Sequence, residues 1–236
     1  MRRYYLDLVD YQTAWDLQKD LAAARGQDLL PDTLLLLQHP HTYTLGSSGT
    51  RDHLLMSPAE LQRHKVTVLD VDRGGDITYH GPGQLVGYPI LKLPTHDEHM
   101  KIRVVDYIRQ LEAVIINAIR EFGVQGQRLE GYTGVWVDID GTLHKMAAIG
   151  VKVNARGITM HGFALNVNTD MNFFAGIIPC GIDDKPVISL QQLLGQPVDF
   201  QQVIAAVGDA FETVFDVEVI PASPTELLQF SNIYPL

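Results

Sequence analysis

Cysteine is almost absent from this sequence of 236 residues, because Cys180 is the only one. A single thiol cannot form a disulfide within the chain, which excludes the disulfide-stapled class of small secreted proteins. Zinc sites built from pairs of cysteines are excluded as well. The sequence therefore favours a reducing compartment, and we expect a cytoplasmic protein.

Positive charge is also scarce: 18 Lys and Arg stand against 28 Asp and Glu, a formal net charge of −10. Nucleic-acid phosphates and anionic membrane surfaces attract positive patches, so we expect neither as a partner. The longest aliphatic run, Leu34 to Leu37, is far shorter than the roughly 20 residues of a membrane-spanning helix. Asp7 and Asp10 interrupt the apolar N-terminal residues, which therefore lack a signal-peptide core.

Apolar periodicity predicts an α+β fold in one domain, residues 1–236, without linkers or repeats. Residues spaced three or four apart predict a long helix from Lys101 to Phe122, ended by Gly123. The Asp140-Gly141 pair predicts a hairpin turn. Further helices are expected at 11–27, 58–63, 188–194 and 200–215, and strands at 5–10, 33–38, 42–45, 66–71, 85–93, 135–139, 147–153, 158–167 and 217–220.

The segment from Arg73 to Gln84 has four glycines, together with several side chains that donate hydrogen bonds. Glycines let the backbone approach a ligand closely, which favours a ligand cradle. It is not a phosphate-binding Walker loop, since no Gly-Lys-Ser/Thr follows, nor a dinucleotide fingerprint, since it leads into a strand. A tight connection between strands with incidental polar residues remains the alternative.

Two further segments contain candidate functional residues, a lysine and the cysteine. Lys145 begins a strand of small, apolar residues, and either serves a thin ligand lying against the backbone or extends to solvent from an edge strand. Cys180 lies between Pro179 and Gly181, and either packs in the core or acts as an accessible thiol activated by a nearby positive charge. Lys145 is the candidate for that charge.

Other catalytic signatures are missing. The segment from Gly46 to Gly49 does not match the Gly-x-Ser-x-Gly elbow of serine hydrolases. The pairs His39 and His41, and His96 and His99, lack the helical spacing and third ligand of a catalytic zinc site. We interpret these imidazoles as solvated or satisfied in the core, and expect no metal and no cofactor.

Taken together, the motifs resemble the lipoyl(octanoyl) transferase family. RGGDITYHGPGQLVGYP at 73–89 resembles its signature loop, KMAAIGVKV at 145–153 its lysine strand, HGFALNVN at 161–168 the following strand and PCGI at 179–182 its nucleophile turn. HPHTYTLG at 39–46 is similar to an early family segment. Asp76 stands where the family more often has Gln. Four motifs in the same order make this resemblance specific.

The resemblance implies the fold of the biotin and lipoate protein ligase catalytic domain, a mixed β-sheet flanked by helices. It implies transfer of an octanoyl group from octanoyl-acyl carrier protein to a lysine of lipoyl domains, as the first step of endogenous protein lipoylation. The implied acceptors are the lipoyl domains of 2-oxoacid dehydrogenases and the glycine-cleavage H protein.

The resemblance also implies which residues form the site. Cys180 is implied as the nucleophile that carries a thioester intermediate, and Lys145 as its catalytic partner. The implied acyl-binding residues are Arg73, Gly74, Gly75, Asp76, Ile77, Thr78, Tyr79, His80, Ala148, Ile149, Gly150, Gly162, Phe163 and Ala164.

Two other functions use the same residues differently. A lipoate or biotin protein ligase shares the fold but activates its acid with ATP, and Lys145 would then serve the adenylate. A fatty-acyl binding module would hold a chain without transferring it. Acyl carrier proteins and lipoyl domains are usually acidic, so their encounter with an acidic chain favours a local basic patch. Its candidates are Arg51, Arg63, Lys65, Arg73, Lys101, Arg103 and Arg109.

Overall fold

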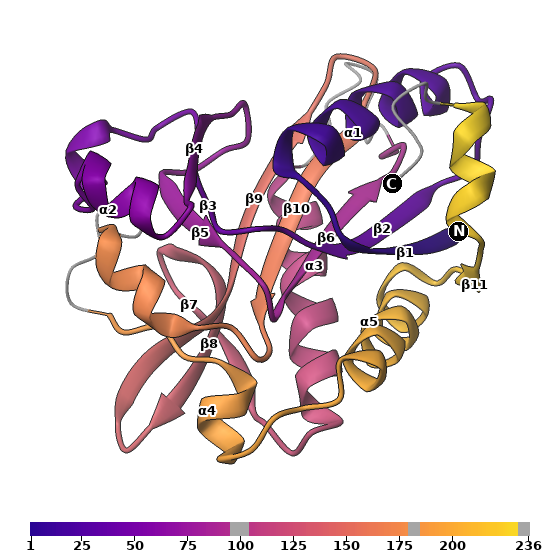
Figure 1. Cartoon of the computed structure of the whole chain (residues 1–236). Helices are drawn as coiled ribbons and strands as arrows, with labels where there is room; N and C mark the ends of the chain where they lie inside the picture. The colour runs from indigo at the N-terminus through magenta and orange to yellow at the C-terminus, as the bar shows by residue number, and fades with distance from the viewer. Residues whose placement is uncertain (95–103, 179–184, 231–236) are drawn as a thin grey trace.

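The computed structural model describes residues 1–94, 104–178 and 185–230. In this part of the chain the strands form two sheets, a large one of eight strands and a small one of three (Figure 1). The large sheet has the order β11-β1-β2-β6-β10-β9-β8-β7 and is mixed, because β1 runs parallel to β2 and β11 while the other neighbours run antiparallel. Its strands are β1 (Arg2–Leu8), β2 (Thr33–Gln38), β6 (Gln84–Ile90), β7 (Gly126–Leu129), β8 (Tyr132–Ile139), β9 (Thr142–Val153), β10 (Thr159–Asn166) and β11 (Ile220–Pro221).

The small sheet forms beside the large one. Its strands are β3 (Thr42–Leu45), β4 (Thr67–Asp70) and β5 (Ile77–His80), with β3 in the centre. The helices are α1 (Tyr11–Arg25), α2 (Pro58–Arg63), α3 (Val104–Arg120), α4 (Leu190–Leu194) and α5 (Phe200–Phe215), with short 3₁₀ turns η1 (Arg51–His53), η2 (Met171–Gly176) and η4 (Pro224–Gln229).

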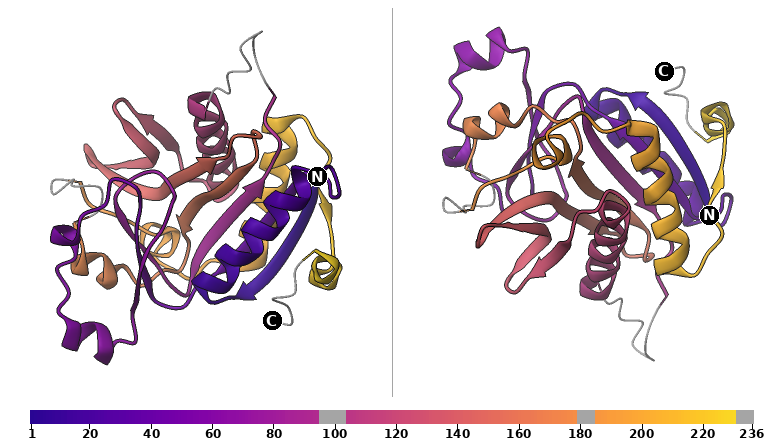
Figure 2. Two further views of the ribbon diagram at one scale, coloured as in Figure 1. Left: turned by 90° about the horizontal axis from the view of Figure 1, so that it is seen from above. Right: turned by 90° about the horizontal axis from the view of Figure 1, so that it is seen from below.

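Helices cover both faces of the large sheet: α1 packs on one face, and α3 with α5 on the other (Figure 2). The leucines of β2 explain this arrangement, because successive side chains of a strand point to opposite faces. Leu34 and Leu36 join the core under α3 and α5, while Leu35 and Leu37 join the core under α1. The predicted fold class, a mixed sheet flanked by helices, is confirmed.

Several local predictions are confirmed to the residue. Helix 200–215 and strands 33–38 and 42–45 have the predicted limits. In α2, Ser57 and Glu60 form a reciprocal capping box and Pro58 occupies the first turn. Asp140 and Gly141 both adopt positive φ, as the hairpin turn between β8 and β9 requires. The long helix is described from Val104 to Arg120, and its predicted start, 101–103, lies outside the described residues.

Other boundaries differ for identifiable reasons. Helix α4 starts at Leu190, and not at Ile188, because the Ile188 amide donates a hydrogen bond to the Lys145 carbonyl and Ser189 caps the helix. The last strand begins at Ile220, and not at Val217, because the Val217 amide still bonds to the C-terminal turn of α5. Strands β5 and β7 were not predicted. No helix among the described residues is long and apolar enough to span a membrane.

Candidate active site

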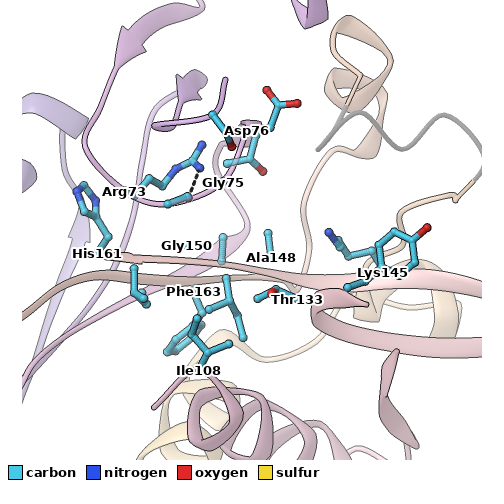
Figure 3. A pocket seen from close by; sticks show the side chains of 18 of the residues that line it. Arg73, Gly75, Asp76, Ile108, Thr133, Lys145, Ala148, Gly150, His161 and Phe163 are labelled. Atoms are coloured by element: carbon cyan, nitrogen blue, oxygen red, sulfur yellow. Dashed lines mark hydrogen bonds between the residues drawn. The ribbon is translucent and has the colours of Figure 1, made fainter. Parts of the chain in front are cut away.

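A cavity of about 560 Å³ opens between the two sheets. Its roof is the 73–76 loop and β5, and its floor is formed by β9 and β10, with the first turns of α3 beneath these strands (Figure 3). Gly131 and the start of β8 line the cavity near Lys145. Of the predicted acyl-binding residues, these line it: Arg73, Gly74, Gly75, Asp76, Thr78, His80, Ala148, Ile149, Gly150, Gly162, Phe163 and Ala164. Lys145 also lines it.

The floor is narrow because its residues are small. Gly150 faces Gly162, and Ala148 faces Ala164, across the antiparallel β9–β10 pair. The Gly74 amide donates a 3.0 Å hydrogen bond to the Val151 carbonyl, which draws the roof onto β9. A Cβ at Gly150 would lie only 2.7 Å from the Gly74 carbonyl oxygen. Only glycine therefore allows the roof and the floor to approach this closely.

The roof is fixed to the small sheet by Arg73, which is 6% exposed. Its Nη2 donates to the Thr44 carbonyl at 2.6 Å and its Nε to the Thr44 hydroxyl at 3.3 Å. This burial removes Arg73 from the proposed basic docking patch. Another candidate, Arg51, pairs with Asp70, and Lys101 and Arg103 lie outside the described residues.

Two predicted acyl-binding residues point away from the cavity. In β5, Thr78 and His80 face the cavity, so the alternation of a strand turns Ile77 and Tyr79 to the opposite side. Both pack in the core of the small sheet, where the Tyr79 ring stacks on Phe173 with centroids 5.1 Å apart.

Lys145 lies at one end of the cavity (Figure 3). It is 8% exposed, and its Nζ lies 4.9 Å from the centroid of the Trp136 ring. Strand β9 has neighbours on both sides, so the edge-strand alternative does not apply. The burial follows from an internal strand whose next residues, Met146 and Ala147, belong to the core.

Cys180 lies outside the described residues, but the chain on both sides of it is described. On the N-terminal side, the Ile178 amide donates to the His53 carbonyl at 2.9 Å. On the C-terminal side, the Lys145 amide donates to the Pro186 carbonyl at 2.8 Å, and Val187 forms a parallel bridge with Lys145. Lys145 is thus bonded to the segment that follows Cys180.

The opposite end of the cavity is a wall of buried aromatic and imidazole side chains. His161 bonds to Asp72 Oδ1 through Nε2 at 2.7 Å, and its Nδ1 lies 3.5 Å from the Tyr11 hydroxyl. His39 bonds to the Tyr88 hydroxyl at 2.7 Å. Burial lowers the pKa of His39 and of His161 to about 4, so both rings are neutral at pH 7.

A buried carboxylate supports the start of β8. Glu112 of α3 is fully buried and accepts hydrogen bonds from Arg109 at 2.7 Å and Arg128 at 3.0 Å. It also accepts one from the Gly134 amide at 3.2 Å. Gly134 follows Thr133, a cavity residue, so this ion pair links α3 to the wall of the cavity.

Comparison with known proteins identifies the family. A family model of the lipoyl protein ligase A/B catalytic domain matches residues 10–212. The octanoyltransferase of Chloroflexus aurantiacus is 46% identical over 221 residues, which cover 92% of this chain and 96% of that protein. The octanoyltransferase of Caldicellulosiruptor saccharolyticus is 46% identical over 231 residues, 97% and 94% of the two chains. This chain is a member of the octanoyltransferase family.

An octanoyltransferase is an enzyme of the acyltransferase class, as predicted. Among solved structures, the bi-partite lipoate protein ligase of Thermoplasma acidophilum superposes with a TM-score of 0.74 at 14% identity, covering 97% of this chain and 88% of that one. An identity this low shows the fold alone. The predicted likeness to lipoate ligase catalytic domains is confirmed.

Sequence reasoning missed part of this octanoyltransferase site. Tyr11, Tyr88 and His161 line the cavity but were not proposed for it. Two of them carried a signal, since Tyr88 lies in the motif at 73–89 and His161 opens the HGFALNVN motif one residue before Gly162. Of the two alternatives expected for His39, solvated or satisfied in the core, the structure shows the second, because its Nδ1 also bonds to the Val9 carbonyl at 2.7 Å. Among the described residues, no group of three or more His, Cys, Asp or Glu side chains could hold a metal ion.

Proposed function

We propose that this octanoyltransferase takes the octanoyl group from octanoyl-acyl carrier protein onto Cys180, as a thioester, and passes it to the lysine of a lipoyl domain. The acceptors are the lipoyl domains of 2-oxoacid dehydrogenases and the glycine-cleavage H protein, and the reaction belongs to the cytoplasm, where a thiol stays reduced. The family supports the transfer of an octanoyl group. The donor, the thioester and the individual residues are our inference.

One observation carries the proposal most strongly. Lys145 lies at the end of a narrow cavity floored by small residues, and its backbone is bonded to the segment that follows Cys180. A linear acyl chain fits such a floor, and each buried methylene contributes about 0.8 kcal/mol. The chain would then present its carbonyl at the Lys145 end.

In the first half-reaction the Cys180 thiolate attacks the thioester carbonyl of the donor. The bond from the carbonyl carbon to the Cys180 sulfur forms and the bond to the carrier sulfur breaks. The carrier leaves as a thiol by taking a proton from the Lys145 ammonium, which becomes the neutral amine. A thiol with the ordinary pKa of about 8.5 is only a few per cent thiolate at pH 7. A positive charge on Lys145 would increase that fraction.

In the second half-reaction the ε-amine of the lipoyl-domain lysine attacks the Cys180 thioester. An amide bond forms, the bond from carbon to the Cys180 sulfur breaks, and the thiol is restored. The amine must lose a proton, and Lys145 in its neutral form is the candidate base. Two half-reactions through one covalent intermediate predict ping-pong kinetics.

Donor selection separates this proposal from the ligase alternative. The purified protein is given a lipoyl domain with octanoyl-acyl carrier protein and no ATP, or with octanoate and ATP. We expect octanoyl-lysine only with the carrier-bound donor, detected as a mass increase of the lipoyl domain. If the lipoyl domain were modified only with octanoate and ATP, the protein would be a ligase and our proposal would be wrong.

The acyl-binding alternative is tested in the same assay. A binding module would retain the octanoyl chain and modify no lipoyl domain with either donor. A lipoyl domain whose acceptor lysine is changed to arginine is the matched control, because it keeps the charge and removes the nucleophile. Equal labelling of this control would contradict transfer to the lipoyl lysine.

A further inference from the structure

A buried histidine with a constrained backbone forms the far end of the cavity. His161 lies there, one residue before the small floor residue Gly162, and opposite Lys145 (Figure 3). Its side chain is 1% exposed. Its backbone has φ +56°, in the left-handed region, although it lies within strand β10. Such a conformation persists in a non-glycine residue only when the surroundings impose it.

The surroundings of His161 do impose it. The His161 amide donates to Gln18 Oε1 of α1 at 2.7 Å, which holds the backbone from one side. The imidazole ring is held by Asp72, which bonds to Nε2, and by the Tyr11 hydroxyl, which lies near Nδ1. Asp72 is in turn paired with Lys152. Both ring nitrogens therefore have partners within the protein, and a ligand meets the ring as a fixed surface.

The distance along the floor is that of a medium-length acyl chain. His161 pairs with Val151, and Ala148 lies three residues earlier on β9. At about 3.3 Å per strand residue, Ala148 and Val151 lie roughly 10 Å apart along β9. This is close to the length of an extended eight-carbon chain whose carbonyl lies toward Lys145. Because the roof contacts Gly150 and Val151 directly, the chain would lie beside these two residues and not over them.

We propose that His161 is the residue that limits the length of the acyl chain, by closing the cavity where an octanoyl chain ends. This inference rests on the proposed function and adds the substrate selectivity of the same site. A longer chain would have to move the His161 ring away from Asp72 and Tyr11, so the buried imidazole would lose both of its hydrogen bonds. A chain that ends before the wall keeps all of these bonds.

The test compares acyl donors in competition. Equal amounts of octanoyl-, decanoyl- and dodecanoyl-acyl carrier protein are mixed with the enzyme and a lipoyl domain, and the modified lysines are weighed. In the wild-type enzyme we expect octanoyl to exceed decanoyl by about tenfold or more. In His161→Asn, which is smaller and tolerates positive φ, we expect this ratio to fall by at least about tenfold. His161→Gly should admit dodecanoyl as well.

A surface histidine provides the matched control. His64→Asn changes an exposed histidine at the end of α2 and should leave the ratio unchanged. A ratio that stays within twofold in both His161 variants, while octanoyl transfer persists, would overturn the role of His161 and leave the proposed function intact. If the wild type transfers no octanoyl group, the proposed function itself fails.

A second measurement needs no variant, in case the His161 variants do not fold. The wild-type enzyme is loaded with an octanoyl donor that carries a photoreactive diazirine next to its terminal carbon, then irradiated and digested. We expect the label on His161 or on its neighbours Tyr11 and Arg73. A label on Val104 or Ile108, at the α3 side of the cavity, would show that the chain ends elsewhere and would overturn the inference.

Discussion

Lys145 gives the sharpest prediction at the scale of single residues. Replacing it with methionine keeps the apolar length of the side chain and its packing against Trp136 but removes the charge and the base. Loss of a general acid–base group costs about 10²–10⁴-fold in rate. We expect the rate at which Lys145→Met transfers octanoyl to a lipoyl domain to fall by about this factor, measured in a single turnover.

A matched control distinguishes chemistry from folding. Lys19→Met changes a lysine on the surface of α1, whose Nζ also lies over an indole ring, 4.0 Å from Trp15. We expect this control to transfer octanoyl at the wild-type rate. Wild-type transfer by Lys145→Met would remove Lys145 from the mechanism.

Gly150 gives a second prediction, which concerns the fit between roof and floor. Gly150→Ala places a methyl group 2.7 Å from the Gly74 carbonyl, so the 73–76 loop must shift away from β9. A displacement of about 1 Å in a substrate-positioning element can cost roughly 10²-fold, and we expect kcat/KM to fall by about this factor. Gly26→Ala, at the end of α1, should keep wild-type kcat/KM. Equal loss in the two variants would point to a general effect of the added methyl group.

The lining residues of the site were predictable to different degrees. The glycine-rich loop and the small strand residues carry local patterns, and most of them line the cavity. Tyr11 carries no such pattern, because it reaches the cavity through the packing of α1 on β6. Ile77 and Tyr79 belong to a predictable motif, yet strand alternation turns them away from the cavity.

At the scale of elements, the attachment of α3 to β8 depends on Glu112. Glu112→Gln removes the charge from a fully buried group that faces two arginines and an amide. Breaking a buried ion pair by changing one partner typically costs about 3–5 kcal/mol. Because Arg109 and Arg128 are partly exposed and can be hydrated, we expect a smaller loss, about 2–3 kcal/mol in the free energy of unfolding in urea.

The control for Glu112 is one of its own partners. Arg109→Gln leaves Arg128 and the Gly134 amide on the carboxylate, so we expect it to cost less than half as much as Glu112→Gln. Equal losses would mean that the carboxylate contributes only through Arg109. A loss below about 0.5 kcal/mol for Glu112→Gln would contradict its structural role.

The elements that could be predicted are those whose own sequence specifies them. Helix α5 and strand β2 have strong apolar patterns and clear ends, and both were located to the residue. Strand β5 was not, because its glycine-rich surroundings resemble a connection and its pairing partner, β3, is distant in the chain: even the nearest pair, Leu45 with Ile77, is 32 residues apart. Strand β7 has no apolar alternation of its own and depends on pairing with β8.

At the scale of the whole molecule, buried histidines make stability depend on pH. Burial lowers the pKa of His39 and His161 from 6.5 to about 4, and places that of His80 well below 6.5. Between these values the unfolded chain binds protons that the folded protein does not. Their contribution is therefore complete above about pH 6.5 and declines toward pH 4, by up to about 1.4 kcal/mol per unit for each histidine.

Urea unfolding between about pH 7.5 and pH 4.5 measures this dependence. We expect the free energy of unfolding to be level at the upper end and to fall steadily below about pH 6.5. In His161→Asn we expect the free energy of unfolding to fall less steeply with decreasing pH, because one buried histidine fewer takes up a proton on unfolding. A wild-type free energy that stays constant down to about pH 4.5 would contradict the burial of neutral imidazoles.

The central claim concerns Cys180, and one measurement tests it most directly. The enzyme is mixed with octanoyl-acyl carrier protein, separated from it, weighed intact, and then given a lipoyl domain without further donor. We predict a mass increase of one octanoyl group that maps to Cys180, disappears on addition of the lipoyl domain and reappears on its lysine. Full activity of Cys180→Ala, or no adduct in an enzyme that still transfers octanoyl, would contradict the account.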